Sequence, residues 1–417
     1  MEFNKFKLKE LLQVNPRMTL KKGSKAKKIA MENIKEFQKK IDNFTIEEFK
    51  SGSKFQNGDT LLARITPCLE NGKTAYVDIL EDDEIAFGST EFFVLRPIDN
   101  KLDSQFLYYL FRTKKVREII IKSMTGTSGR QRAQKDSILE YECEVPTIEY
   151  QRKIAIILKN LDDKIEINKK IIANLEELSQ TLFKHWFVGF EFPDKDGKPY
   201  KSNGGEMIDS ELGKIPKGWI VKSLDEIANY INGLAMQKYP SNKEESLPIV
   251  KIKELKNGFT DENSNRCTTE IPEKAKIDNG DIIFSWSATL LVKMWAGGKA
   301  GLNQHLFKVT SETFPKWFYY LWTKRYIEYF INIANDKATT MGHINRKHLS
   351  HAKIVLPTQL QLENFDKIFH NLLEKQLNTE EEIKRLIELR DTLLPKLMSG
   401  ELEIPDDIEV NSDEFSI

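Results

Sequence analysis

The sequence carries the same aromatic segment twice, half a chain length apart. FLYYLF (Phe106–Phe111) and WFYYLW (Trp317–Trp322) stand 211 residues apart in a chain of 417 residues. The same shift places Pro146–Thr147 on Pro357–Thr358. Upstream, KFQNGD and KIDNGD match at a shift of 222, so the middle of the first copy is eleven residues longer. A repeat this long predicts two tandem domains of similar fold and not a solenoid.

After each Pro–Thr pair, seam positions recur at alternating steps of four and three. In the first copy they are Ile154, Leu158, Leu161, Ile165, Asn168, Ile172, Leu175, Ser179, Leu182 and Trp186. In the second they are Phe365, Phe369, Leu372, Gln376, Thr379, Ile383, Leu386, Arg390, Leu393 and Leu397. This spacing over more than four heptads, with Lys and Glu between, predicts coiled-coil helices that end at Gly189 and Gly400. Pro395 is expected to kink the second helix or end it early.

Five seam positions are polar, and two interpretations of them stay open. Asn168, Ser179, Gln376, Thr379 and Arg390 are either tolerated irregularities or groups that fix the register and the partner of each helix. An antiparallel pairing of the two helices would form a rod. The helix from Ile154 to Trp186 would be roughly 50 Å long at about 1.5 Å per residue, a spacer of defined length.

The part that precedes each long helix mixes strands with helices. DTLLARI and DIIFSW follow Asn-Gly turn signals and are predicted strands, as are EFFVLRP and its counterpart LFKVT. Helical periodicity extends over 104–121 and 315–331. The aromatic segments continue that period, which favours a place in the core over a platform on which bases stack.

Composition narrows the class of protein. No apolar run approaches the roughly 20 residues of a membrane span, and the start MEFNKFKLKE lacks the apolar region of a secretory signal. Cys68, Cys143 and Cys267 are scattered, which favours a reducing cytosol over a disulfide framework or a zinc ribbon. Net charge is zero, but residues 401–417 hold seven acids and no base, so the rest of the chain is about +7. A basic surface of this kind suits a polyanionic partner.

A small, polar, basic segment follows the aromatic helix in each copy. These segments are MTGTSGRQRAQKD (Met124–Asp136) and KATTMGHINRKHLSH (Lys337–His351). Hydroxyl, amide and guanidinium groups are those that hold phosphates and read base edges. One such loop is usually only a solvated loop, whereas two at equivalent places favour a binding role.

No catalytic constellation is recognisable in the sequence. GGKAG lacks the spacing and the hydroxyl of a phosphate-binding loop, and there is no G-x-G-x-x-G and no methyltransferase motif. PDKDGK is read as a turn and not as a nuclease site, and His343, His348 and His351 lack partners at metal spacing. We therefore expect no catalytic residues, no metal and no cofactor in this chain.

In order and duplication the motifs resemble the specificity subunit of type I restriction-modification systems. The residues that carry the resemblance are NGDTLLARITPCLENGK from 57, TIEYQRKIAIILKNLDDKIEINKKIIANLEELSQTLFKHWF from 147, GKIPKGW from 213, ATTMGHINRKHL from 338 and LRDTLLPKLMSGEL from 389. The first copy departs from the pattern, with GTSGRQRAQKDSIL in place of ATTMGHINRKHL and no counterpart of IPKGW.

The resemblance implies an α+β fold in which two similar mixed α/β target recognition domains are separated by an antiparallel coiled coil, in a pseudo-two-fold tandem repeat. The expected segments are recognition domain 1 (1–146), a central helix (147–189), a linker (190–212), recognition domain 2 (213–357), a distal helix (358–400) and an acidic tail (401–417). A cytoplasmic, non-catalytic subunit is implied.

The implied partners are double-stranded DNA, two modification subunits that hold S-adenosylmethionine, and two restriction subunits that use ATP and Mg²⁺. No membrane partner is implied. Each domain would read half of a bipartite site, with about 10 to 15 base pairs between the readers. The competing hypotheses are a structural coiled-coil adaptor whose ends bind protein, and a stand-alone methyltransferase or nuclease.

The candidate DNA-contacting residues lie in the basic segments and at the ends of two predicted strands. In the first copy they are Arg64, Thr127, Ser128, Arg130, Gln131, Arg132, Gln134 and Lys135. In the second they are Ser285, Thr339, Thr340, His343, Asn345, Arg346 and Lys347.

Overall fold

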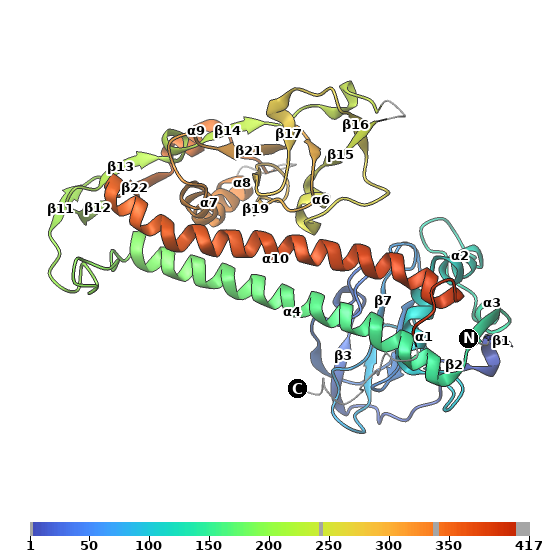
Figure 1. Ribbon diagram of the computed structural model, residues 1–417. Coiled ribbons are helices and arrows are strands. Elements are labelled where there is room, and N and C mark those ends of the chain that lie inside the picture. Colours follow the sequence, from blue (N-terminus) through green and yellow to red (C-terminus); the bar gives the residue numbers. More distant parts are fainter. Residues whose placement is uncertain (1–2, 242–244, 337–341, 406–417) are drawn as a thin grey trace. The chain divides into compact units, whose positions relative to one another are not determined.

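The computed structural model describes residues 3–241, 245–336 and 342–405. The chain divides into two compact units, of which unit 1 comprises residues 1–165 and 386–417 and unit 2 comprises residues 166–385. The division cuts through two long helices, α4 (Ile148–Phe187) and α10 (Gln359–Ser399). Each unit therefore consists of one globular part and one part of each long helix (Figure 1).

The described part of unit 1 holds two four-stranded sheets, ordered β2-β9-β6-β7 and β4-β3-β8-β5, and a ladder of β1 with β10. The strands of the first sheet are β2 (Leu12–Val14), β9 (Phe92–Pro97), β6 (Thr60–Ala63) and β7 (Thr74–Tyr76). The second sheet contains β4 (Thr45–Glu48), β3 (Lys25–Ile29), β8 (Ala86–Gly88) and β5 (Ser53–Phe55). The ladder joins β1 (Phe3–Lys7) to β10 (Glu142–Pro146). Only β3 and β8 pair in parallel among these strands.

The described part of unit 2 repeats this topology strand for strand. Its sheets are ordered β14-β21-β18-β19 and β16-β15-β20-β17, and β13 pairs with β22. The strands are β14 (Asn229–Asn232), β21 (Leu306–Thr310), β18 (Ile282–Ser285), β19 (Leu291–Met294), β16 (Arg266–Thr268), β15 (Ser246–Val250), β20 (Ala300–Leu302), β17 (Lys276–Ile277), β13 (Ile220–Ser223) and β22 (Lys353–Leu356). β15 and β20 again form a parallel pair, as β3 and β8 do. A hairpin of β11 (Met207–Ser210) and β12 (Gly213–Pro216) precedes β13. The four strands predicted from the sequence are confirmed as β6, β9, β18 and β21.

The aromatic segments lie on short helices, and each predicted helix is in fact two. Unit 1 has α1 (Ser104–Arg112) and α2 (Lys114–Lys122), and unit 2 has α7 (Lys316–Arg325) and α8 (Ile327–Asp336). The prediction of one continuous helix in each copy is wrong. In unit 1 the break falls at Thr113, whose backbone is extended and whose hydroxyl donates to Leu110 O at 2.7 Å. A hydroxyl that satisfies a terminal carbonyl in this way competes with helix continuation.

The remaining helices are short. The α-helices are α3 (Lys135–Leu139), α5 (Leu224–Ile227), α6 (Ile252–Asn257) and α9 (Arg346–His351). The 3-10 helices are η1 (Leu8–Glu10), η2 (Met31–Asn33), η3 (Met236–Lys238) and η4 (Glu273–Ala275). α3 begins at the end of the first basic segment and α9 forms the end of the second, so the two helices start at equivalent places in the repeat, 211 residues apart.

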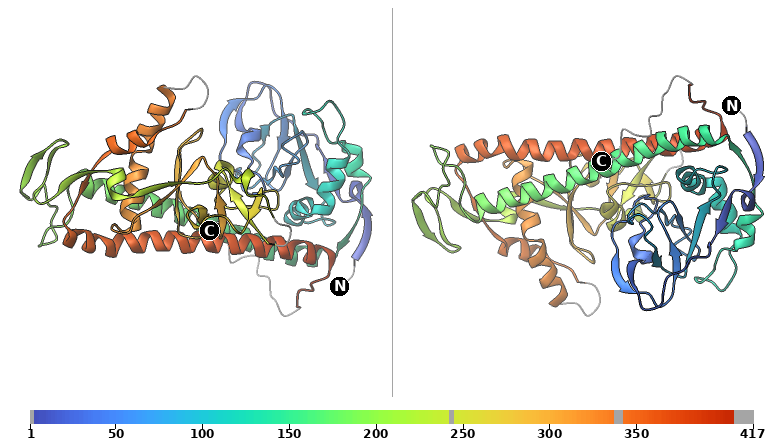
Figure 2. Two further views of the ribbon diagram at one scale, coloured as in Figure 1. Left: turned by 90° about the horizontal axis from the view of Figure 1, so that it is seen from above. Right: turned by 90° about the horizontal axis from the view of Figure 1, so that it is seen from below.

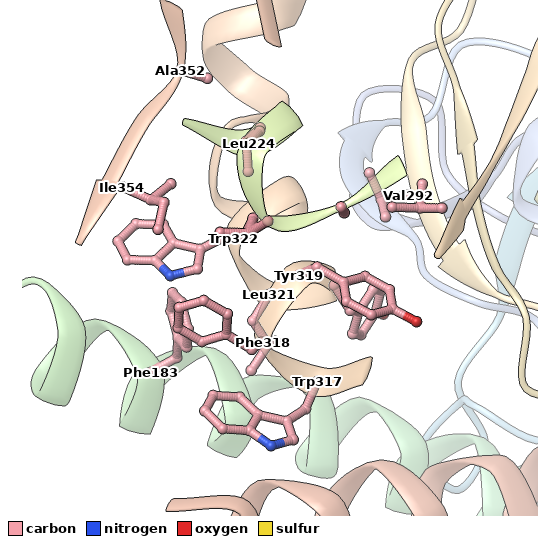
Figure 3. Close-up of a cluster of buried hydrophobic side chains, with 14 of the residues drawn as sticks. Phe183, Leu224, Val292, Trp317, Phe318, Tyr319, Leu321, Trp322, Ala352 and Ile354 are labelled. Atoms are coloured by element: carbon pink, nitrogen blue, oxygen red, sulfur yellow. The ribbon is translucent and has the colours of Figure 1, made fainter. Parts of the chain in front are cut away.

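Both aromatic segments are buried, as predicted. Every residue of Phe106–Phe111 and of Trp317–Trp322 is at most 6% exposed. In unit 2 the segment packs against the C-terminal half of α4, where the rings of Phe183 and Trp322 meet edge to face at 5.0 Å (Figure 3). Trp317 stacks on Phe369 of α10 at 4.5 Å. The segment thus joins the sheets of the unit to the long helices.

The long helices pack against one another in opposite directions. In unit 1, Asp162 of α4 bonds Arg390 of α10 at 2.7 Å, and in unit 2 Trp186 contacts Phe365 with ring centroids 4.9 Å apart. As residue numbers increase along α4, the residues that they contact on α10 have decreasing numbers. This confirms that the two helices pack antiparallel (Figures 1 and 2). None of the twenty seam positions is exposed.

The ends of the long helices agree with the predicted stop signals. Gly189 follows the end of α4 by two residues, and Gly400, with a φ of +76°, follows α10 directly. A left-handed residue at this place is a common helix end that favours glycine. Pro395 was predicted to kink α10 or to end it early, and of these two effects the early end is wrong, because Pro395 lies inside the helix.

Candidate nucleic-acid interface

The first basic segment, Met124–Asp136, is closed by hydrogen bonds at its base. The N–H of Thr125 donates to Arg132 O at 3.1 Å, and that of Arg132 donates to Thr125 O at 2.9 Å. Gln134 reinforces the closure, because its Nε2 donates to Thr125 Oγ1 at 2.7 Å. The exposed residues between these ends include Thr127, Ser128 and Arg130. A fixed base thus presents hydroxyl and guanidinium groups to solvent.

Three charged side chains of unit 1 meet beside this loop. Arg132 donates to Glu91 through Nε and Nη2, the latter at 2.7 Å, and Arg64 donates to Glu91 Oε2 through Nε at 3.1 Å. The hydrogen bond from Arg132 holds the pKa of Glu91 below its usual value, burial opposes that shift, and Arg64 adds to it. The carboxylate is therefore charged at neutral pH and orients both guanidinium groups.

The corresponding place in unit 2 is occupied by rings. Trp286 follows β18, His305 precedes β21, and His343 lies in the second basic segment. The indole ring of Trp286 lies 6.0 Å from the ring of His305 and 6.4 Å from that of His343. Ser287 Oγ lies 3.3 Å from Nδ1 of His305. This cluster offers both hydrogen-bond donors and hydrogen-bond acceptors, because a neutral imidazole has one nitrogen of each kind.

The other predicted residues are placed unequally. Asn345 and Lys347 are exposed, as are Gln134 and Lys135, whereas Gln131 is half-buried. Arg346 is exposed but already donates to Tyr230 O at 3.0 Å. Ser285 is 0% exposed and its hydroxyl donates to Ser287 O, so we remove it from the candidate contacts. Thr339 and Thr340 lie outside the described residues.

Glu91, Trp286 and His305 were missed in the sequence. A signal for them existed, because Glu91 and His305 stand directly before β9 and β21, the two strands that the sequence already paired as counterparts. Trp286 stands one residue after β18, as Arg64 does after β6. Position relative to the repeated strands, and not residue type, would have identified them.

Polar contacts fasten each globular part to the long helices. In unit 1, Tyr109 of α1 donates to Asp162 at 2.7 Å, and Lys39 donates to the Tyr109 hydroxyl at 3.2 Å. In unit 2, Lys324 of α7 bonds Glu176 of α4 at 2.7 Å. In both units the helix that carries the aromatic segment bonds a carboxylate of α4. The donor is a tyrosine hydroxyl in unit 1 and a lysine ammonium group in unit 2.

The three polar seam residues of α10 fall into two groups. Arg390 reaches across to the other helix, whereas Gln376 bonds Glu380 and Thr379 bonds Lys375 O, each within its own helix. The interpretation that a polar seam residue fixes register therefore fits Arg390. For Gln376 and Thr379 the interpretation as tolerated polar groups fits better.

Within the described ranges, no cluster of three or more His, Cys, Asp or Glu side chains is arranged to bind a metal ion. No helix in these ranges combines the length and the apolar character needed to cross a membrane.

A family model described as the type I restriction modification DNA specificity domain matches residues 1–177 and 216–389. The chain belongs to this family. The two matches coincide with the two repeats, and each includes part of a long helix as well as the globular part.

Individual specificity subunits are similar over most of the chain. The MjaIX specificity subunit of Methanocaldococcus jannaschii is 31% identical over 309 residues, which cover 72% of this chain and 69% of that protein. The HindI specificity subunit of Haemophilus influenzae is 27% identical, over 83% of this chain and 87% of that protein. The crystal structure of a type I restriction-modification S subunit from M. genitalium has the same fold, with a TM-score of 0.53, 17% identity and 97% coverage of both chains.

Proposed function

We propose that this specificity subunit reads a bipartite site in double-stranded DNA, with one half-site for each unit. The supporting observation is the repetition of both four-stranded sheets and of the two-stranded ladder, with a polar, basic segment at the same place in the sequence after each aromatic helix. Two readers of equal fold but different side chains suit two different half-sites. Guanidinium, hydroxyl and amide groups in these loops provide both phosphate contacts and base contacts.

The paired helices α4 and α10 serve as the spacer and as the docking surface of two modification subunits. Leu178 on α4 is 52% exposed, and its repeat partner Leu389 on α10 is 47% exposed. Both leucines are exposed on helices whose seam is buried, so a partner protein can reach them. Since the repeat supplies this residue twice, it supports two docking sites of the same kind.

The chemistry belongs to the partners in this proposal. S-adenosylmethionine is held by the modification subunits, and ATP with Mg²⁺ by two restriction subunits that join them. This chain contributes recognition and spacing, and it takes no catalytic part.

The decisive experiment sequences DNA from cells that express this chain with the modification subunit of its own system, with single-molecule detection of modified adenine. The expected result is a split motif of two short defined halves with a constant gap. A stable complex of the two proteins that modifies no DNA and shows no salt-dependent affinity for DNA would instead support the structural adaptor.

A further inference from the structure

The cluster of Arg64, Glu91 and Arg132 and the cluster of Trp286, His305 and His343 stand on the same backbone frame. In unit 1 the N–H of Arg64 donates to Glu91 O at 3.0 Å, and the N–H of Ala133 donates to Arg64 O at 2.8 Å. In unit 2 the N–H of Trp286 donates to His305 O at 3.5 Å, and that of Ile344 donates to Trp286 O at 3.1 Å.

A further pair of contacts completes the frame. Thr66 N–H donates to Gln131 O at 3.0 Å in unit 1, and Ala288 N–H donates to Gly342 O at 3.1 Å in unit 2. Isolated bridges join Ile65 to Arg132 and Ser287 to His343. The three positions of one cluster therefore correspond to those of the other, at shifts of 222, 214 and 211 residues in chain order.

The surroundings of these positions are alike, whereas their side chains are not. Arg64 lies over the ring of Phe93 at 5.5 Å, and Trp286 lies against the ring of Phe307 at 5.7 Å. Phe93 and Phe307 are both buried residues of the strand that follows the second cluster position. At the cluster positions themselves, two arginines and a glutamate are exchanged for an indole and two imidazoles.

A purely structural role does not account for this exchange. If the bonds among Arg64, Glu91 and Arg132 were needed to hold the frame, unit 2 could not form the same frame without an ion pair at these positions. The backbone hydrogen bonds hold the frame in both units, so the side chains are free to differ. Variable groups on a rigid support are what a preorganised recognition site requires.

We infer that positions 64, 91 and 132 in unit 1 and positions 286, 305 and 343 in unit 2 determine which bases each half-site contains. The side chains at these positions either contact base edges of duplex DNA or hold the side chain that does, and the inference rests on the proposed function. It deepens that function by assigning base specificity to three side chains in each unit, and these three come from three separate segments of the chain.

Within unit 1 the three side chains have different roles. Arg132 donates two hydrogen bonds to Glu91, through Nε and Nη2. Arg64 donates to the same carboxylate through Nε, so the Nη atoms of Arg64 take no part in that bond. Arg64 is the reader, and Glu91 and Arg132 are positioning residues. A guanidinium fork pairs best with O6 and N7 of guanine, so the half-site of unit 1 contains a G·C pair at this point.

The test uses the complete complex in cells and sequences the modified sites for four variants. Arg64→Lys keeps the charge without the fork, and Glu91→Gln keeps the shape without the charge. His305→Gln addresses unit 2. The matched control is Glu142→Gln, which removes an exposed ion pair with Lys5 at 2.6 Å on the ladder of β1 and β10.

We expect Arg64→Lys and Glu91→Gln to relax one or two positions of one half-site, with a loss of discrimination of about 5- to 150-fold. The other half-site and the gap should remain unchanged. His305→Gln should relax only the opposite half, and Glu142→Gln should change nothing.

Two outcomes overturn the inference while leaving the proposed function intact. In the first, the variants fold, assemble and modify the wild-type motif unchanged. In the second, both half-sites weaken equally, with a DNA salt slope reduced by about one, which identifies phosphate contacts. If the wild-type complex modifies no split motif, it is the proposed function that fails. Thermal melting and co-purification of each variant with the modification subunit separate these results from misfolding.

Discussion

Asp162 of α4 and Arg390 of α10 form a buried ion pair, with Oδ1 and Nη1 2.7 Å apart and both side chains 6% exposed. Burial alone would raise the pKa of Asp162, but Arg390, Arg112 and Lys39 hold it below its usual value. Because the partners lie 228 residues apart and on different helices, the pair defines the register in which the helices meet in unit 1.

Replacing Arg390 by Ala should destabilise unit 1 by about 3–5 kcal/mol, because the Asp162 carboxylate would be left buried without its main partner. Urea unfolding of the full chain measures the loss. The double variant Asp162→Asn/Arg390→Met should recover most of it, and Arg385→Ala, at an exposed position of the same helix, is the control. A loss below about 1 kcal/mol for Arg390→Ala would contradict a register role.

Lys39 should make the stability of unit 1 rise with pH above neutrality. Burial lowers its pKa to about 8 from 10.5, against the opposing effect of Asp162, Asp163 and Asp78, while Lys159 adds to the lowering. Between these two values the unfolded chain binds more protons than the folded one, so raising the pH favours folding. Between pH 7 and 9.5 the free energy of unfolding of the wild type should gain about 2 kcal/mol relative to Lys39→Met. Parallel pH profiles of the two proteins would disprove this.

Docking of the modification subunits should depend on two equivalent leucines. Leu178→Glu or Leu389→Glu alone should leave a complex with one modification subunit, and the double variant should leave none, because a buried carboxylate at either interface is unfavourable. Native mass spectrometry counts the subunits. Ala173→Glu places the same charge on an exposed position of α4 about 140° around the helix from Leu178 and should keep both. Full assembly by the double variant would move the docking surface elsewhere.

The gap in the DNA site should follow the length of the helix pair. Four residues inserted in α4 alone add about 6 Å and are expected to lengthen the gap by one or two base pairs. The four inserted residues also shift the seam of α4 against that of α10. Inserting one heptad in each helix, after Ile165 and after Arg385 where the two units divide, lengthens both helices and keeps the seam in register. That variant adds about 10 Å, or about three base pairs. Sequencing of modified sites reads the gap directly, and an unchanged gap in the heptad variant would refute the spacer.

Much of this architecture follows from local patterns. The repeat, the long helices and their seam are encoded by spacing, since burial of one face imposes a period that survives in the sequence. Four strands and the burial of the aromatic segments follow for the same reason. The division of the aromatic helix in unit 1 was not predictable in this way, because the hydroxyl of Thr113 interrupts the backbone without disturbing the apolar period.

The sequence by itself determined that two similar domains and two paired helices would form, because periodicity and duplication are properties of the chain alone. Only the tertiary structure decided that Asp162 meets Arg390, and that Arg64, Glu91 and Arg132 occupy the frame that Trp286, His305 and His343 occupy in the other unit. These groups come from segments far apart in the chain, and their contacts are set by sheet order and helix register. No local pattern records such contacts, since each side chain satisfies its hydrogen bonds with a partner that folding alone brings near.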